Sequence, residues 1–139
     1  MTMPDHIDNT DDVIDSRDII ARIQLLEELR DEHVIGAPDG TETPNPEGWR
    51  EEYPDDAEEL DMLTALADEA KDYAPDWEYG ATLIRETYFV DYCQELVEDI
   101  GDLPKGLPSY IEIDWTATAR NIRMDYTEVE FGGVTYLIR

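Results

Sequence analysis

The chain has few cysteine and histidine side chains, which build many catalytic and transition-metal sites. Its single cysteine, Cys93, cannot form a disulfide within the chain, which indicates a reducing, intracellular setting. Cys93 falls on the apolar side of its expected helix, where a buried, unreactive thiol belongs. Only two histidines occur, His6 and His33, which nearly excludes zinc or acid–base sites that depend on histidine.

Long apolar runs are also missing. No apolar stretch approaches the roughly 20 residues that span a bilayer. The first residues, MTMPDHIDNTDD, have neither the basic nor the apolar run of a signal peptide. We therefore expect a cytoplasmic protein that does not contact a membrane.

Motifs of the common enzyme classes do not occur. There is no phosphate-binding G-x-x-x-x-G-K-[ST], no dinucleotide-binding G-x-G-x-x-G and no nucleophile elbow G-x-S-x-G. The stretches nearest to a calcium loop are DNTDDVIDSRDI, which lacks the central glycine, and DGTETPNPEGWR, which has Pro and Asn where ligands belong. Carboxylate pairs are too numerous for any one pair to indicate hydrolysis. We expect no enzyme, no cofactor and no metal site.

Basic residues are scarce, and acidic residues are abundant. There are 36 Asp and Glu against 10 Lys and Arg, a net charge of −26, whereas a small domain commonly carries about 2–8 charges. Residues 1–113 hold a net charge of −25 and residues 114–139 only −1. A halophile's protein would instead spread acid evenly. Such a field repels nucleic acid and anionic membranes and attracts basic proteins, among which DNA-binding proteins are the largest class.

Composition divides the chain into segments. Residues 1–14 are polar and acidic, and we expect a flexible arm there. The remaining residues, 15–139, predict one domain of ordinary size with an acidic helical part, 15–80, and a second part, 81–139. Within the helical part, residues 35–54 contain four prolines and three glycines, which favours a long loop over a helix or a central strand.

Helical periodicity begins directly after the arm. In DSRDIIARIQLLEELRDEHV, either Asp15 or Ser16 is a suitable N-cap. Apolar residues then recur at helical spacing from Ile19 to Leu29 and predict an amphipathic helix. Arg22 falls on the polar side, and we expect it to face solvent.

A second helix is predicted in the most acidic stretch, EEYPDDAEELDMLTALADEAKDY. Asp55 or Asp56 is the expected N-cap, and Pro75 ends the helix soon after Tyr73. The expected core side consists of Leu60, Leu63, Leu66 or Ala67, Ala70 and Tyr73. The expected outer side consists of Glu58, Asp61, Ala65, Asp68, Glu69 and Asp72, and its acids would line about 20 Å of surface at 1.5 Å per residue.

The C-terminal part mixes strands and helices. Residues 81–86 predict a strand, residues 87–101 a helix with Phe89, Cys93, Leu96, Val97 and Ile100 on its inner face, and Asp114 is an expected N-cap for a short helix. Alternating apolar residues on both sides of Gly132-Gly133 predict a β-hairpin. The expected fold class is α+β, with several amphipathic helices and a small antiparallel sheet ending in a C-terminal β-hairpin.

Residues 88–139, YFVDYCQELVEDIGDLPKGLPSYIEIDWTATARNIRMDYTEVEFGGVTYLIR, follow a recognisable order of features. An acidic helix ends in EDIG, an LP turn and a YI stretch follow, then a helix rich in Ala and aromatic residues, and the closing hairpin MDYTEVEFGGVTYLIR. In this order the segment resembles the C-terminal part of the ArdA-type antirestriction proteins.

The resemblance implies a DNA mimic. Proteins of that type are acidic, elongated and dimeric, come from plasmids, transposons and phages, and occupy the DNA-binding groove of type I restriction enzymes without cofactor or catalysis. A basic DNA-binding protein of a bacterial defence system would then be the partner, with no direct nucleic-acid contact, and a homodimer is left open. Its location would be the cytoplasm of a bacterial host cell.

The candidate binding residues are the acids of the two most acidic helices and their flanks. They are Glu51, Glu52, Asp55, Asp56, Glu58, Asp61, Asp68, Glu69, Asp72, Asp91, Glu95, Glu98, Asp99 and Asp102. Trp77 and Tyr79 are candidate aromatic contacts, because Trp and Tyr are enriched at binding hot spots. Three alternatives stay open at this point: an anti-CRISPR protein that blocks a Cas effector or nuclease, a phage or plasmid accessory module whose acid only solvates it, and an enzyme or metal-binding protein.

Overall fold

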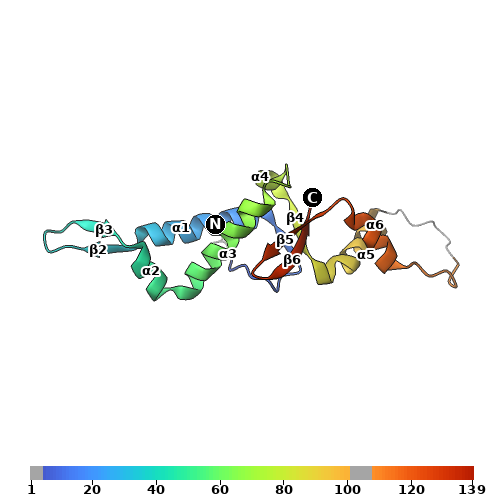
Figure 1. The fold of residues 1–139 in the computed structure, drawn as a ribbon, viewed down its shortest axis with the longest axis horizontal. Helices are drawn as coiled ribbons and strands as arrows, with labels where there is room; N and C mark the ends of the chain where they lie inside the picture. The colour runs from blue at the N-terminus through green and yellow to red at the C-terminus, as the bar shows by residue number, and fades with distance from the viewer. Residues whose placement is uncertain (1–4, 101–107) are drawn as a thin grey trace.

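The computed structural model describes residues 5–100 and 108–139, and it is elongated (Figure 1). A four-stranded antiparallel sheet lies near the middle, with helices on both sides of it along the long axis. The first half contains β1 Val13–Asp15, α1 Ser16–Glu32, β2 Val34–Gly36, β3 Glu42–Pro44, α2 Pro46–Glu52 and α3 Pro54–Ala70. The second half contains α4 Trp77–Gly80, β4 Thr82–Arg85, a 3-10 turn η1 Glu86–Tyr88, α5 Phe89–Ile100, α6 Trp115–Arg123, β5 Thr127–Phe131 and β6 Val134–Ile138.

The sheet confirms the expected α+β class and the C-terminal hairpin. Its strand order is β1-β4-β6-β5, with Val129 of β5 opposite Tyr136 of β6. Gly132 and Gly133 form the two-residue turn with φ of 56° and 86°, which other residues rarely adopt. The predicted strand at 81–86 is confirmed as β4.

Alternation along the central strands separates two apolar clusters. Successive side chains of a strand point to opposite faces, so Leu83 joins one cluster and Ile84 the other, and Ile138 and Leu137 divide in the same way. The larger cluster lies under α1 and α3, and the smaller one under α5 and α6. The sheet therefore joins the acidic helical part to the C-terminal helices through side chains on both of its faces.

Helix α1 follows the sequence prediction closely. Asp15 is the N-cap, and its carboxylate accepts a hydrogen bond from the Arg17 amide. Ile19 and Leu26 are fully buried. Arg22 does not face solvent as expected, because it turns toward α3 and pairs there with Glu59.

Helix α3 confirms the second prediction in its core side but not at its ends. Leu60, Leu63, Leu66 and Ala70 are buried against the sheet and α1. The helix starts at Pro54, so Asp55 and Asp56 lie in its first turn and are not N-caps. Proline suits that first position because the missing N–H has no helical partner to lose. Tyr73 lies beyond the last turn and is exposed, so its expected place in the core is wrong.

Helix α5 buries only some of the residues that its sequence predicts for the inner face. Phe89 and Cys93 are buried, and burial raises the pKa of the Cys93 thiol, as expected of an inert structural cysteine. Leu96 is 36% exposed and Ile100 60% exposed, because the smaller cluster ends near Cys93. Asp114 caps α6 as predicted, accepting a hydrogen bond of 3.0 Å from the Ala117 amide.

The N-terminal segment is not a flexible arm over residues 5–14. Ile7 is buried, Tyr136 donates a hydrogen bond to the Asp11 carbonyl, and the Asn9 side chain donates one of 3.1 Å to the Gly132 carbonyl. The segment crosses from α3 to the hairpin turn and then forms the edge strand β1. Its polar composition conceals two buried isoleucines, Ile7 and Ile14, and these hold the segment against the core together with its backbone hydrogen bonds.

Residues 35–54 are not one long loop. They hold most of the β2–β3 hairpin and the whole of α2, which is capped by Asn45 and contains the buried Trp49. Pro46 opens α2, where proline is tolerated, and Pro38 lies in the hairpin turn. The prolines therefore lie at the ends and turns of short helices and strands and do not prevent these elements from forming.

Candidate acidic partner-binding surface

The outward acids of α3 form two rows. At 100° per residue, Asp61 and Asp68 lie within about 20° of each other around the helix, and Asp55, Glu58 and Glu69 lie within about 60° of one another on the neighbouring side. We call the first the paired row and the second the groove row. All five side chains are exposed.

The paired row is partly neutralised by cations of this chain. Arg50 of α2 makes two hydrogen bonds of 2.8 Å to the Asp61 carboxylate, and these lower the pKa of that carboxyl. Lys71 lies 3.4 Å from Asp68. An incoming basic partner would have to compete with both cations, so the paired row presents less usable negative charge than its sequence suggests.

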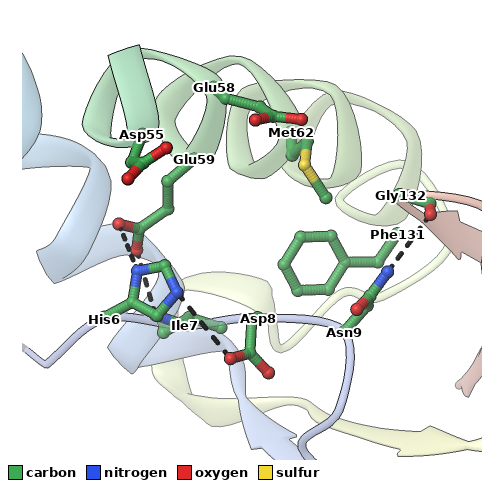
Figure 2. A pocket seen from close by; sticks show the side chains of 10 residues that line it. All are labelled: His6, Ile7, Asp8, Asn9, Asp55, Glu58, Glu59, Met62, Phe131 and Gly132. Carbon is green, nitrogen blue, oxygen red and sulfur yellow. Dashed lines mark hydrogen bonds and ion pairs between the residues drawn. The ribbon is translucent and has the colours of Figure 1, made fainter. Parts of the chain in front are cut away.

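The groove row borders an open groove of about 720 Å³ between α3 and the N-terminal segment (Figure 2). Asp55 and Glu58 line it from the helix, and Asp8 lines it from the N-terminal segment on the opposite side. Within the described residues, no Lys or Arg lies within ion-pair distance of Asp55 or Glu58. The groove row therefore carries the negative charge of α3 that is most available to a partner.

Glu69 ends the groove row and has a structural role. Its carboxylate accepts a hydrogen bond of 3.1 Å from the Glu130 amide, on the outer edge of β5. An exposed strand edge is a template for unwanted pairing. Glu69 thus closes part of that edge while remaining exposed.

Glu59, which is not among the predicted binding residues, lies below the groove as the only buried carboxylate among the described residues. Arg22 makes two hydrogen bonds of 2.8 Å to it, the Ile7 amide donates one of 3.0 Å, and His6 Nδ1 lies 2.8 Å away. Burial opposes its ionisation, but these hydrogen bonds outweigh burial and lower the pKa of Glu59. The cluster fixes the N-terminal segment, α1 and α3 in one arrangement and so holds both walls of the groove.

A signal for Glu59 is present in the sequence. It precedes Leu63 by four residues and Leu66 by seven, so it stands within the apolar side of the helix. An acid in that position needs a cation beside it, and Arg22 is the middle one of the three arginines in the preceding amphipathic helix, between Arg17 and Arg30.

The remaining candidate acids fall into separate places. Glu51 and Glu52 lie on α2, where Glu52 is 3.8 Å from His33, and Asp72 follows α3. Asp56 lies 3.9 Å from Arg22 and is half-buried, so it belongs to the edge of the buried cluster. Helices α2 and α3 lie on the same side of the sheet (Figure 1).

The acids of α5 lie across the sheet from α3 (Figure 1). Glu95 accepts hydrogen bonds from the Tyr88 hydroxyl, Glu98 accepts one from Gln94, and Asp91 and Asp99 are exposed. Asp102 lies outside the described residues. The structure therefore does not join the α3 and α5 acids into one row.

Of the two aromatic candidates, only Tyr79 is accessible. Its side chain is 77% exposed, whereas Trp77 is 7% exposed and packs in the larger apolar cluster. Trp77 is therefore wrong as a contact residue. Its carbonyl instead accepts a hydrogen bond of 2.7 Å from Ser16, which joins α4 to the start of α1.

Metal-binding groups and membrane-spanning helices were sought in the described residues. The described part of the chain contains no group of three or more His, Cys, Asp or Glu side chains placed to hold a metal ion. In residues 5–100 and 108–139, no helix has the length and apolar composition needed to cross a bilayer.

The net charge predicts an unusual salt response. Raising NaCl from about 0.05 to 1 M shortens the screening length from over 10 Å to about 3 Å and weakens repulsion among the acids. We expect the melting temperature to rise by several degrees, because about 1 kcal/mol shifts the midpoint of a small domain by roughly 2–8 °C. Circular dichroism melts in NaCl and in KCl would measure this. A midpoint that falls with salt would mean that internal ion pairs outweigh the repulsion.

Function has to be inferred from the chain itself. Searches against protein-family models, curated proteins and solved structures found no match. The surface described above, the shape of the molecule and the ordering of features in residues 88–139 are therefore the grounds on which a function can be proposed.

Proposed function

We propose that this protein is a DNA mimic that inhibits a DNA-binding host-defence complex by occupying its DNA-binding site. A type I restriction-modification enzyme is the first candidate target, because residues 88–139 resemble ArdA-type antirestriction proteins. The inhibitor acts by binding alone, with no catalytic step and no cofactor.

One observation carries the proposal: the groove row has acids without basic partners on a fixed helix. Asp55 and Glu58 are one helical turn apart, and Asp8 faces the same groove. Side chains three or four residues apart on a helix lie about 5–6 Å from each other, a spacing similar to that of successive phosphates along a strand. Arg50 and Lys71 are directed to the paired row, which leaves the groove row to an external cation.

Shape and rigidity support the same function. The molecule is elongated, and α3 presents its acids from Asp55 to Glu69 along about 21 Å at 1.5 Å per residue. The Glu59 cluster and the apolar core hold that helix in place, so the negative charges need little ordering when a partner binds. The acidic helix would then complement the charge of a basic channel that evolved for DNA. Their association would be rapid and would slow as salt concentration rises.

The proposal is tested in cells that carry a type I restriction system. Expression of the protein should raise the plating efficiency of unmodified phage toward that of modified phage, since blocked restriction no longer distinguishes them. Modified phage in the same cells is the control for general toxicity. A parallel strain with active CRISPR interference separates the two classes of target. Unchanged plating in both strains would overturn the proposal.

A purified system gives the matching mechanism. Inhibition of DNA cleavage should be stoichiometric, should be relieved by excess DNA and should weaken as NaCl rises, because both ligands use the same basic site. Inhibition that excess DNA does not relieve would point to a site away from the DNA channel and contradict mimicry.

A further inference from the structure

We propose that the outer edge of β2 pairs with an extended, basic segment of the partner protein, adding a strand to the β2–β3 hairpin. This inference takes the basic character of the partner from the proposed function, but the strand-edge chemistry stands on the hairpin itself. The hairpin lies at one end of the long axis, beyond the helices (Figure 1). All six of its strand residues are exposed.

The hairpin is ordered although it buries little. At its base, the Asn45 amide donates a hydrogen bond of 2.8 Å to the His33 carbonyl, between the end of α1 and the start of α2. At its tip, Ala37 donates one of 2.8 Å to Thr41, and the Asp39 carboxylate accepts two from Thr41. A preorganised ribbon that protrudes without a packing role loses little entropy on binding.

The register shows which backbone groups are available. Pairs in an antiparallel ladder alternate between hydrogen-bonded and non-hydrogen-bonded. His33–Asn45 and Ala37–Thr41 are hydrogen-bonded, and Val34 lies opposite Pro44 and Gly36 opposite Glu42. The N–H and C=O groups of Val34 and Gly36 therefore point away from β3, to the open side of β2.

The two edges of the hairpin differ. On β3, Pro44 has no N–H and Glu42 places a charge, which are the usual devices that block an edge. On β2, Gly36 has no side chain and open space around it, and Val34 and Ile35 are apolar and exposed. Only the β2 edge is suited to main-chain pairing of the kind seen in strand addition.

Charge decides between a basic partner and a second copy. The charged side chains between residues 34 and 44 are Asp39 and Glu42, both acidic, and Glu32 precedes the hairpin after an Asp31 that pairs with Arg30. Two copies paired through β2 would bring these acids together and oppose association. A segment that alternates Lys or Arg with apolar residues would meet acids and the apolar β2 surface at once.

A soluble decapeptide of alternating lysine and valine is the probe. Amide hydrogen exchange followed by NMR should slow at Val34 and Gly36 by roughly tenfold at a peptide concentration ten times its Kd, by mass action. The Glu42 amide, on the blocked edge, should be unchanged. A decapeptide of equal charge with proline in place of valine cannot donate the ladder bonds and should give no protection.

Two variants isolate the edge. Val34→Pro removes an outward N–H, and His33 already has the extended backbone (φ −78°, ψ 110°) that suits a residue before proline. It should abolish protection at Gly36, and Glu42→Pro, the matched change on β3, should not. Val34→Lys keeps the N–H but adds a positive charge that repels the peptide. If the proline variant unfolds, Val34→Lys replaces it, and it should likewise reduce protection at Gly36.

The outcomes are distinct. Exchange changes confined to α2 and α3 would mean binding by charge alone, which overturns strand addition and leaves the DNA-mimic proposal standing. Protection at Val34 and Gly36 without peptide, together with a dimer in sedimentation, would make a second copy the occupant and also overturn it. Edge protection with no effect on restriction would retain the strand-addition site and reject the restriction target.

Discussion

Replacing Glu59 with alanine should destabilise the fold by up to about 3–5 kcal/mol, the usual cost of removing one partner of a buried ion pair, although Asp56 still lies 3.9 Å from Arg22. Arg22 would be left with its side chain only 13% exposed, and the Ile7 amide and His6 would lose their acceptor. Since small domains have only about 5–15 kcal/mol in total, this one change would remove much of the stability. Chemical denaturation would measure it.

Glu58→Ala is the matched control. It removes the neighbouring carboxylate on the same helix, but Glu58 is exposed and has no cation beside it among the described residues, so we expect a change within about 0.5 kcal/mol. A double variant, Glu59→Leu with Arg22→Met, removes both charges and should recover most of the loss, as apolar replacements of buried pairs often do. If Glu59→Ala cost no more than Glu58→Ala, the buried cluster would not be stabilising.

The pH dependence follows from the same group. The pKa of Glu59 is lower in the folded chain than its ordinary value of 4.5, so its contribution is present above pH 4.5 and is lost as the pH falls through the folded-state pKa. Asp15 and the exposed Asp61 act in the same direction, because hydrogen bonds from Arg17 and Arg50 lower the pKa of these two carboxyls. The stability that these three groups contribute should therefore be present at pH 7 and be lost as the pH falls below about 4, which denaturation at a series of pH values would measure.

The elements that the sequence predicts correctly are those fixed by local pattern. The Gly132-Gly133 hairpin, the Asp15 and Asp114 caps and the Leu60–Leu63–Leu66 side of α3 each depend on neighbours within a few residues. Trp77 shows where prediction from local sequence fails. An aromatic residue between charged neighbours has no local feature that distinguishes a core position from an exposed contact.

Long-range pairing explains most of what the sequence concealed. Arg22 was placed on the solvent side of its helix because its partner lies 37 residues away, and the anchoring of Ile7 depends on a carboxylate 52 residues away. The division of the α3 acids into a groove row and a paired row depends on where Arg50 of α2 is held. A count of acids finds the charge, but only the fold decides which acids are already neutralised.

That division gives the sharpest test of the proposed mimicry. Asp55→Lys with Glu58→Lys should weaken binding to a purified type I restriction enzyme by roughly a thousandfold, since losing a buried charge contact costs about 2 kcal/mol or more and each 1.4 kcal/mol is tenfold. Binding would be measured by competition against a fluorescent DNA duplex at fixed salt. Melting temperatures would show whether the helix tolerates lysine in its first turn, where the dipole disfavours it.

Asp61→Lys with Asp68→Lys is the control, because it alters net charge by the same amount on the same helix. Those acids already neutralise Arg50 and Lys71, so their reversal removes less charge that a partner can use, and we expect a loss below tenfold. Equal losses from the two variants would mean that the partner responds to net charge and not to the groove row. A larger loss from Asp61 and Asp68 would assign the contact to the face of α3 that carries Arg50, and the groove would then be no part of the interface.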